Sequence, residues 1–328
     1  MIRAFNVSIA AVADSVSNVA VGAMRMEFWR EAISKTYQGS PPKEPVTQLL
    51  AHALNNMKEH RGQMNKAWFL RVISTREKYM DNPPYPTLAS LESYAESTYS
   101  TLLYLTLSAL PLHSVTADHL ASHVGKASGI AAVLRGLPLV AFPAQERTHS
   151  NAPGGASLEG KSIGARKRSS NSRGTVTLPL DVMAEAGLRE EEVLRQGASA
   201  PGLQDAVFAV ATRANDHLIT AREMLKRIRA GQDVGHGYEH ADEHSDYHRQ
   251  QHQVSTPSLM ASPPQPSQAS NQASEVERAF GLLLPAVSTS LWLDRLQRAD
   301  FDVFRPELRR RDWRLPWKAY WAYQRRQF

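Results

Sequence analysis

Apolar residues recur at helical spacing over most of the chain, which is the pattern of helices with one buried face. The sequences Gly39-Ser40-Pro41-Pro42 and Asn82-Pro83-Pro84 mark ends of such segments. Strand-like alternation is nearly absent, and Thr175 to Leu178 is the only short candidate. The segments predicted to be helical are residues 4–37, 45–59, 63–80, 87–110, 116–135, 204–229 and 276–298.

Two stretches interrupt the helical pattern. Residues 143–173 are rich in Gly, Ser, Asn and basic side chains, and residues 231–273 are rich in His, Gln, Ser and Pro. Neither stretch has enough large apolar side chains to offset the entropy lost on ordering, so we expect two disordered insertions. The prediction is one all-α domain, built from residues 1–142, 174–230 and 274–328.

Composition excludes little beyond thiol chemistry. The chain has 328 residues, of which 42% are apolar, and it has no cysteine, so disulfides and thiolate catalysis are excluded. Its net charge of +6 is compatible with a nucleic acid, an anionic membrane or an acidic protein as partner. The best apolar run, Leu102 to Leu112, is shorter than the ~20 residues of a spanning helix, and no secretory signal follows Met1.

Six short motifs occur in order along the chain. They are Ala4-Phe5-Asn6-Val7, Met24-Arg25-Met26-Glu27-Phe28-Trp29, Tyr94-Ala95-Glu96-Ser97-Thr98, His123-Val124-Gly125-Lys126-Ala127, Thr177-Leu178-Pro179-Leu180-Asp181 and Asp300-Phe301-Asp302-Val303-Phe304. Together they resemble the squalene/phytoene synthase superfamily, and most closely its mitochondrial complex I assembly factor six branch. The resemblance covers about residues 2–142, 174–230 and 274–328. It implies the helical bundle of isoprenoid synthases, with the two insertions spliced into it.

The resemblance also implies which residues a working enzyme would need. The active enzymes join two prenyl diphosphates, with Mg²⁺ ions bridging the diphosphates to carboxylates on two facing helices. In the first acidic motif, the two leading acids fall on Ala10 and Ala11, and only Asp14 remains. The tyrosine that assists the squalene synthases falls at Ser97.

The second acidic motif, which starts at Gly125, is degenerate as well. Arg135 alone keeps its identity, whereas the expected Gln, Asn and two Asp are replaced by Gly129, Ala132, Gly136 and Val140. A single carboxylate beside a diphosphate repels it. We therefore predict a pseudoenzyme without catalytic residues, without a bound metal and without a cofactor.

Five polar residues remain as candidates for a remnant anion or lipid pocket: Asp14, Arg25, Tyr94, Lys126 and Arg135. For Asp14, an ion pair with Arg25 or Arg135 is favoured over metal ligation, because single carboxylates make poor Mg²⁺ sites. Arg135 and Lys126 could still attract an anionic head group. A buried Arg135 paired with Asp14 is favoured over that, because buried charges are normally paired.

Two further motifs fall inside the insertions. His236, His240, His244, His248 and His252 recur every four residues, as in a zinc or nickel site, but the surrounding composition favours a low-complexity tract. Arg166-Lys167-Arg168 resembles a nuclear signal, and a solubilising tract is favoured there.

The C-terminal residues 305–328 interleave basic and aromatic side chains, namely Arg309, Arg310, Arg311, Arg314, Lys318, Arg325 and Arg326 with Trp313, Trp317, Tyr320, Trp321 and Tyr323. Such a mixture suits a membrane interface or a protein-binding surface. The alternative is a closing helix whose aromatic rings cap the core, which we predict for Trp313 and Trp317, with the basic tip left to contact an anionic inner membrane. No nucleic-acid motif accompanies these residues, and we expect no nucleic acid as partner.

The function implied by the resemblance is assistance in building respiratory complex I. The protein would act in the mitochondrial matrix, peripherally on the inner membrane, by binding a complex I subunit or an assembly intermediate. Two alternatives stay open at this point. One is a prenyl-diphosphate synthase or transferase with a rearranged site, and the other is a prenyl-lipid-binding protein.

Overall fold

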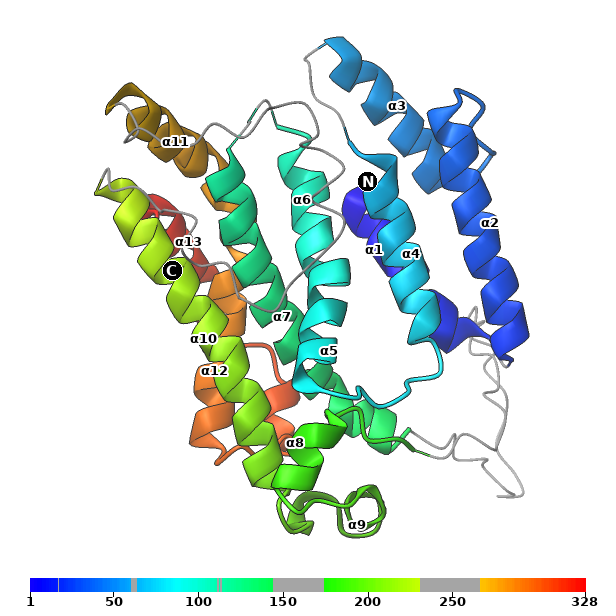
Figure 1. Ribbon diagram of the computed structural model, residues 1–328, viewed down its shortest axis with the longest axis vertical. Helices are drawn as coiled ribbons and strands as arrows, with labels where there is room; N and C mark the ends of the chain where they lie inside the picture. The colour runs from blue at the N-terminus through cyan, green and yellow to red at the C-terminus, as the bar shows by residue number, and fades with distance from the viewer. Residues whose placement is uncertain (17, 60–63, 111, 113, 144–173, 231–265) are drawn as a thin grey trace, which may run out of the picture.

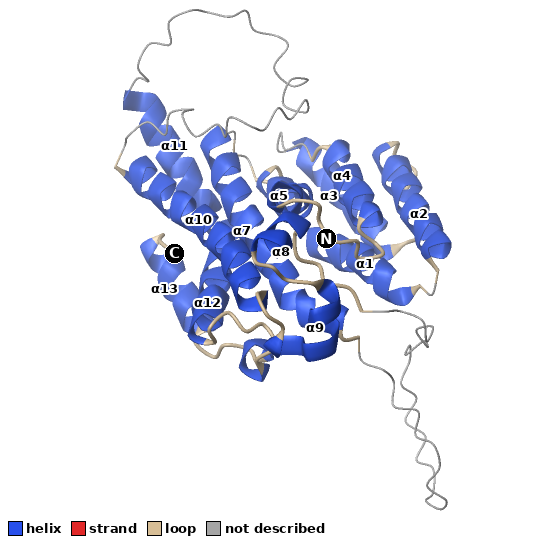
Figure 2. Cartoon of the chain, turned by 60° about the horizontal axis from the view of Figure 1, so that its bottom comes forward, coloured by secondary structure: helices blue, strands red, loops and turns tan. Residues whose placement is uncertain are grey.

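The regular structure consists of helices alone wherever the chain is described, which confirms the predicted all-α fold (Figure 2). The extended stretch Thr175–Leu178 pairs with no strand, so the strand candidate is wrong; Val176 and Leu178 instead bury their side chains in the core. The histidine run and the tribasic motif lie outside the described residues. The computed structural model describes residues 1–16, 18–59, 64–110, 112, 114–143, 174–230 and 266–328.

The first four helices lie together on one side of the molecule (Figure 1). The ring of Phe5 stands edge-on to Phe69, with 5.1 Å between ring centroids, and to Trp29, at 6.0 Å. These rings lie in a core that this side of the molecule builds largely from its own side chains. The helices are α1 (Ile2–Ser15), α2 (Val19–Tyr37), α3 (Pro45–Glu59) and α4 (Lys66–Lys78).

The single helix predicted over residues 4–37 is wrong, because α1 and α2 are separate. Val16 is extended, and Asn18 begins α2 by accepting a hydrogen bond from the backbone N–H of Ala20 at 2.8 Å. A side chain that satisfies one of the first N–H groups of a helix is an effective start signal. No glycine or proline marks this break.

A long central helix, α7 (Val115–Ala141), runs through the larger core. It packs against a continuous rod made of α5 (Leu88–Ala95), a π-helical segment (Glu96–Ser100) and α6 (Thr101–Leu107). By length and composition α7 could cross a membrane, a feature that the sequence analysis missed. Its burial among neighbouring helices is that of the core helix of a folded domain.

The remaining helices cover the other side of α7 (Figure 1). The longest, α10 (Leu203–Arg229), lies along it, and α12 (Pro285–Arg298) packs beside both. The shorter helices on this side are α8 (Leu180–Glu185), α9 (Glu190–Gln196), α11 (Pro266–Ala279) and α13 (Leu315–Arg325).

The helical segment predicted from residue 276 begins earlier in the structure. Its first helix, α11, starts at Pro266. Proline suits the first position of a helix, where its missing N–H has no partner to lose. The first turns of α11 are polar, so no apolar periodicity announced them.

Candidate functional site

The first degenerate motif lies on α1, and the buried face of this helix determines where the motif points. Phe5, Ile9 and Val12 are buried, whereas Ala11 and Asp14 are exposed. Ala10 is half-buried between these two faces. The surviving carboxylate therefore lies near the end of α1, on the solvent side of the helix.

The second degenerate motif lies on α7, where glycine permits an unusually close contact with the neighbouring rod. A Cβ atom at Gly129 would lie 2.5 Å from the Cβ and 2.9 Å from the Cα of Ala95. A Cβ atom at Gly125 would lie 2.4 Å from the Cα of Ser100. Contacts this short are repulsive, so the backbone of α7 leaves no room for a side chain at either position.

The other half of the motif is more open. Nothing lies within 4 Å of the place where a Cβ of Gly136 would stand, and Ala132 and Val140 are half-buried. The Arg135 guanidinium lies over the ring of Trp292, 5.4 Å from its centroid. The retained arginine thus contacts an aromatic face of α12.

These residues do not fit the magnesium ions that the family chemistry implies. Carboxylates would have to converge from α1 and α7 onto diphosphate-bound Mg²⁺. The motif positions on α1 provide one carboxylate, Asp14, and the motif positions on α7 provide no carboxylate. Within the described ranges, no group of three or more His, Cys, Asp or Glu side chains is placed to hold a metal ion.

The members of the predicted remnant pocket lie on α1, α2, α5 and α7. Arg25 donates a hydrogen bond to Ser15 Oγ at 2.6 Å. Tyr94 packs against the rings of Tyr79 and Tyr85, and burial raises the pKa of its hydroxyl. Lys126 is buried on α7. The predicted ion pair of Asp14 with Arg25 or Arg135 stays a prediction, as does the pocket.

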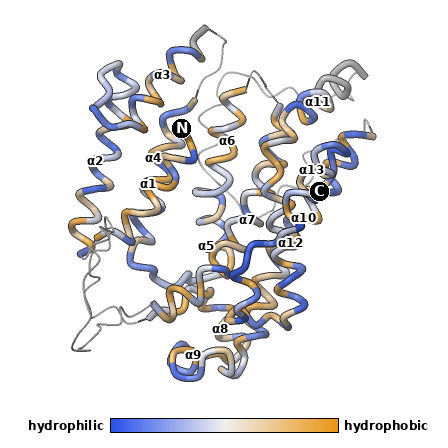
Figure 3. Tube along the Cα trace, turned by 180° about the vertical axis from the view of Figure 1, so that it is seen from behind, coloured by the Kyte–Doolittle hydropathy of each residue, from blue (hydrophilic) through white to orange (hydrophobic). Residues whose placement is uncertain are grey.

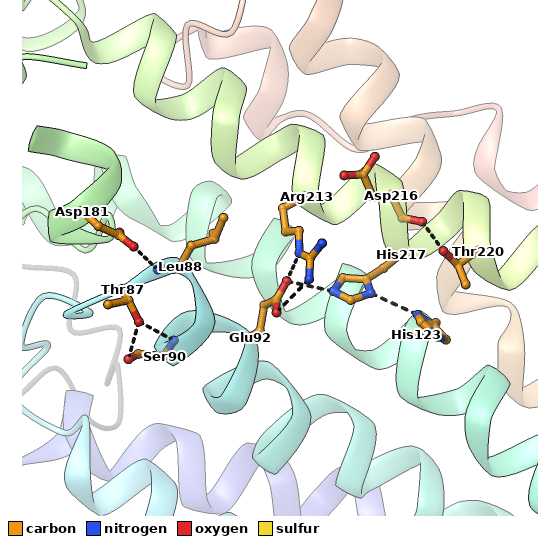
Figure 4. A network of polar contacts seen from close by, with 10 residues as sticks. All are labelled: Thr87, Leu88, Ser90, Glu92, His123, Asp181, Arg213, Asp216, His217 and Thr220. Atoms are coloured by element: carbon orange, nitrogen blue, oxygen red, sulfur yellow. Dashed lines mark hydrogen bonds and ion pairs between the residues drawn. The ribbon is translucent and has the colours of Figure 1, made fainter. Parts of the chain in front are cut away.

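A buried polar network that the sequence analysis missed joins α5, α7 and α10 (Figure 4). Glu92 on α5 accepts hydrogen bonds from Arg213, whose Nη2 lies 3.3 Å from Glu92 Oε2, and from His217 Nε2, at 3.1 Å. His217 Nδ1 lies 3.1 Å from His123 Nδ1 on α7. Glu92 is 8% exposed and His217 is 3% exposed, so the network lies within the core.

The charge on Glu92 is stabilised by its two partners. Burial alone would raise the pKa of the Glu92 carboxyl, but the hydrogen bonds from His217 and Arg213 outweigh burial and hold that pKa at about 2. Because a carboxylate only accepts, His217 donates through Nε2, and the Nδ1 of a neutral His217 then accepts from His123. The network links three helices through one buried negative charge.

A second polar cluster surrounds the π-helical segment. The Glu96 carboxylate accepts hydrogen bonds from Tyr104 Oη at 2.6 Å and from Ser122 Oγ at 2.8 Å. Arg71 on α4 donates to Ser97 Oγ at 3.1 Å. π-helical turns are rare and are enriched at functional sites. Ser97, where the family tyrosine would stand, therefore ties the central rod to α4.

Another family-like motif has a structural role in the same region. The Asp181 carboxylate accepts a hydrogen bond from the backbone N–H of Leu88 at 3.0 Å, at the first turn of α5 (Figure 4). Thr87 accepts a second hydrogen bond from the N–H of Ser90 at 3.1 Å. These two side chains fix the start of the helix that carries Glu92.

A local signal for the network was present on α10. Arg213 and His217 lie one turn apart, next to the apolar stripe of Val210, Ala214 and Ala221. Polar residues at helical spacing beside an apolar face indicate a buried contact. Their partner Glu92 is too distant along the chain to be identified from one sequence.

Known proteins of one family are similar in sequence to this chain over most of its length. The sequence pattern of the squalene/phytoene synthase family matches residues 1–141 and 165–235. Complex I assembly factor 6 of Rattus norvegicus is 33% identical over 97% of this chain and 71% of its own length, and that of Homo sapiens is 30% identical over the same shares. The homolog from Drosophila melanogaster is 27% identical over 98% of this chain and 73% of its own length.

Solved structures support the fold. A dehydrosqualene synthase superposes with a TM-score of 0.59 at 12% identity, over 98% of this chain and 84% of its own. A squalene synthase from Alicyclobacillus acidocaldarius gives a TM-score of 0.56, also at 12% identity, over 91% and 81%. The resemblance inferred from the six motifs is thereby confirmed. The chain belongs to the squalene/phytoene synthase family, in the branch whose curated members are named complex I assembly factor 6.

Proposed function

We propose that this protein assists the assembly of mitochondrial respiratory complex I and does not condense prenyl diphosphates. Relatives named complex I assembly factor 6 match 97% of this chain at 30–33% identity. The protein would act in the matrix, peripherally on the inner membrane, by holding a complex I subunit or an assembly intermediate.

One observation carries the non-catalytic part of the proposal. The residue that replaces the expected glutamine, Gly129, is in direct contact with Ala95 through its backbone. Restoring a long polar side chain there would require α7 to move away from the central rod. This chain therefore differs from the active enzymes in how closely α7 packs against the central rod, as well as in the loss of individual ligands.

Deletion of the gene tests the assembly role. We expect the amount of assembled complex I to fall, while sterol and carotenoid levels stay normal. Reintroduced wild-type protein and the Asp14→Asn variant should restore complex I equally, because no catalytic carboxylate is needed. Unchanged complex I in the deletion strain would contradict the assembly role, and failure of Asp14→Asn alone would point to a working carboxylate.

Incubation of the purified protein with farnesyl diphosphate and Mg²⁺ tests the competing enzymatic function. We expect no release of pyrophosphate and no coupled prenyl product. Metal-dependent turnover would overturn the pseudoenzyme proposal in favour of a synthase with a rearranged site. Binding of the prenyl chain without turnover and without metal dependence would instead indicate a prenyl-lipid-binding protein.

Affinity capture from mitochondria tests the nature of the partner. We expect a complex I subunit or an early intermediate to be retained on the immobilised wild-type protein. Retention should persist for the Asp14→Asn variant. Capture of prenyl-processing enzymes without any complex I component would contradict the proposal.

A further inference from the structure

The helix α13 and the turn before it present aromatic rings to solvent. Trp313 is 77% exposed, Trp317 is 65% exposed, and Tyr320 and Trp321 are each 54% exposed. The prediction that Trp313 and Trp317 cap the core is therefore wrong. Trp317 and Trp321 lie one turn apart on the outer face of α13, and Trp313 is exposed in the turn before the helix. These three residues are called the aromatic stripe below.

The opposite face of α13 explains why the aromatic stripe points outward. Leu315 and Ala322 pack against Val287 and Leu291 of α12, in a small cluster of their own. The end of the chain is also held, because Arg222 Nε donates to the backbone oxygen of Phe328 at 3.0 Å. With its small aliphatic residues docked, α13 has no other buried face available for three tryptophans.

Positive charge is concentrated around the same stripe. Residues 305–328 contain eight basic and two acidic side chains, a net charge of +6, which equals the net charge of the whole chain. The arginine-rich stretch before α13 is coloured as hydrophilic in Figure 3. The rest of the chain is therefore neutral on balance, and any long-range attraction to an anionic partner is directed by this segment.

Most of these cations are not neutralised within the described part of the chain. Of the two acids in the segment, Asp312 pairs with Arg314, with 3.0 Å between Oδ2 and Nη2. Among the described residues, no acidic side chain forms an ion pair with the exposed cations Arg309, Arg310, Arg311, Lys318 and Arg325. Arg325 lies instead over the ring of Trp321, 5.4 Å from its centroid.

We propose that the stripe of Trp313, Trp317 and Trp321, with its flanking arginines, docks the protein on an anionic lipid surface. Indole rings prefer the boundary between water and acyl chains, and arginine and lysine bind the phosphates above it. This proposal names the surface for the membrane contact contained in the proposed function, and it rests on that function only for the choice of membrane.

Several features favour lipid over a protein partner. The rings protrude from a segment that is anchored on one side, and eight basic side chains outnumber two acidic ones around them. A fluid, uniformly anionic surface can accommodate several protruding rings without a preformed groove. An amphipathic helix that carries tryptophan between basic residues is typical of interfacial binding.

Co-sedimentation with vesicles tests the proposal on the full chain. Wild-type protein should bind vesicles of phosphatidylcholine with about one third phosphatidylglycerol, and should not bind phosphatidylcholine alone. Binding should weaken strongly at about 0.5 M salt, where surface charges are screened. Tryptophan fluorescence should shift to the blue on binding. Equal binding to both kinds of vesicle, or none to either, would overturn the proposal.

Two double variants separate the contributions. Trp313→Ser with Trp317→Ser should lower the partition coefficient roughly tenfold or more, because two buried rings are lost. Arg309→Gln with Arg311→Gln should lower it roughly 25-fold, at about five-fold for each basic residue near an anionic surface. Thermal melts that match the wild type show that the variants are folded.

Matched controls lie on other faces of the molecule. Lys43→Gln with Arg195→Gln removes the same charge from exposed positions, and Met24→Ser with Phe28→Ser removes exposed apolar side chains from α2. Both control pairs should bind anionic vesicles like the wild type. Controls that lose binding as much as the α13 variants would overturn the assignment of the surface.

The outcome is distinguishable from failure of the proposed function. If the Trp313 and Trp317 variant binds vesicles normally but no longer retains a complex I component, then α13 is a protein-binding surface and the lipid proposal is overturned. If vesicle binding depends on α13 as expected, the lipid proposal stands whether or not deletion of the gene lowers complex I.

Discussion

Two regions of the molecule depart from the usual rule that polar side chains face solvent and apolar side chains are buried. The contact between α5, α7 and α10 buries polar side chains, whereas α13 exposes apolar ones. The first buries Glu92 and His217, with Arg213 and His123 half-buried beside them, and the second exposes three tryptophans. In the interior, each polar group of the network is matched by a partner on another helix. On α13, the described part of the chain offers the outer rings no comparable cover.

The two regions therefore call for different explanations. The buried charge has a structural role, because its partners hold three helices together and no ligand is needed to satisfy it. The described part of the chain does not cover the exposed aromatic stripe, which is why we propose an anionic lipid surface as its partner. Substitutions in the two regions should therefore affect different measurements.

The largest effect is expected for Glu92→Ala. Removing the carboxylate leaves Arg213 and His217 without their acceptor inside the core, which should lower the free energy of unfolding by about 3–5 kcal/mol. Urea denaturation followed by circular dichroism measures it. Glu31→Ala, which removes an exposed partner of Lys35 on α2, should change stability by only about 0.5 kcal/mol. Similar losses for both would mean that the network contributes little.

The pH dependence of stability tests the same charge without deleting it. The pKa of Glu92 is about 2 in the folded protein, below its ordinary 4.5, so the carboxylate stabilises the fold above pH 4.5. That contribution, up to about 3 kcal/mol, should be lost as the pH falls from 4.5 towards 2. Because other acids titrate in this window, the measurement is the difference between wild type and Glu92→Gln. Parallel pH profiles of the two proteins would contradict the assignment.

Much of the fold was predictable because apolar periodicity records which face of each helix is buried. On α1, for example, the buried residues Phe5, Ile9 and Val12 follow this periodicity. The break before α2 was missed, since Asn18 acts through a local hydrogen bond and leaves the periodicity unchanged. The start of α11 was missed because its first turns carry no apolar stripe.

The missing acidic residues of the candidate site could be predicted from the sequence, whereas the buried polar network and the exposed aromatic stripe could not. Ala10, Ala11 and Gly136 could be read directly at positions where the family has acids. The pairing of Glu92 with His217 depends on how two helices pack, which no local pattern reports. On α13 there are two apolar stripes, one aliphatic and one aromatic, and only the contact of Ala322 with α12 decides which faces inward.

Two glycines on α7 sharpen the comparison within a single helix. Gly129→Ala places a Cβ atom against Ala95 and should destabilise the protein by about 1–3 kcal/mol. Gly136→Ala meets nothing within 4 Å, and should stabilise it by about 0.5–1 kcal/mol because alanine favours the helix. Thermal melts of the two variants should move in opposite directions. Shifts of the same sign would show that α7 does not lie as close to α5 as described.

The smallest effect on stability is expected at the exposed stripe, where an unchanged stability would show that the ring does not support the fold. Trp317→Ser should leave the free energy of unfolding within about 0.5 kcal/mol of the wild type, because the ring is 65% exposed and covers no core residue. Trp29→Ser is the matched control, since its ring packs edge-on against Phe5, and it should cost about 3–5 kcal/mol. Equilibrium unfolding in urea compares the two. A large loss at Trp317 would mean that the ring supports the fold, and the outward stripe would then need no partner outside the chain.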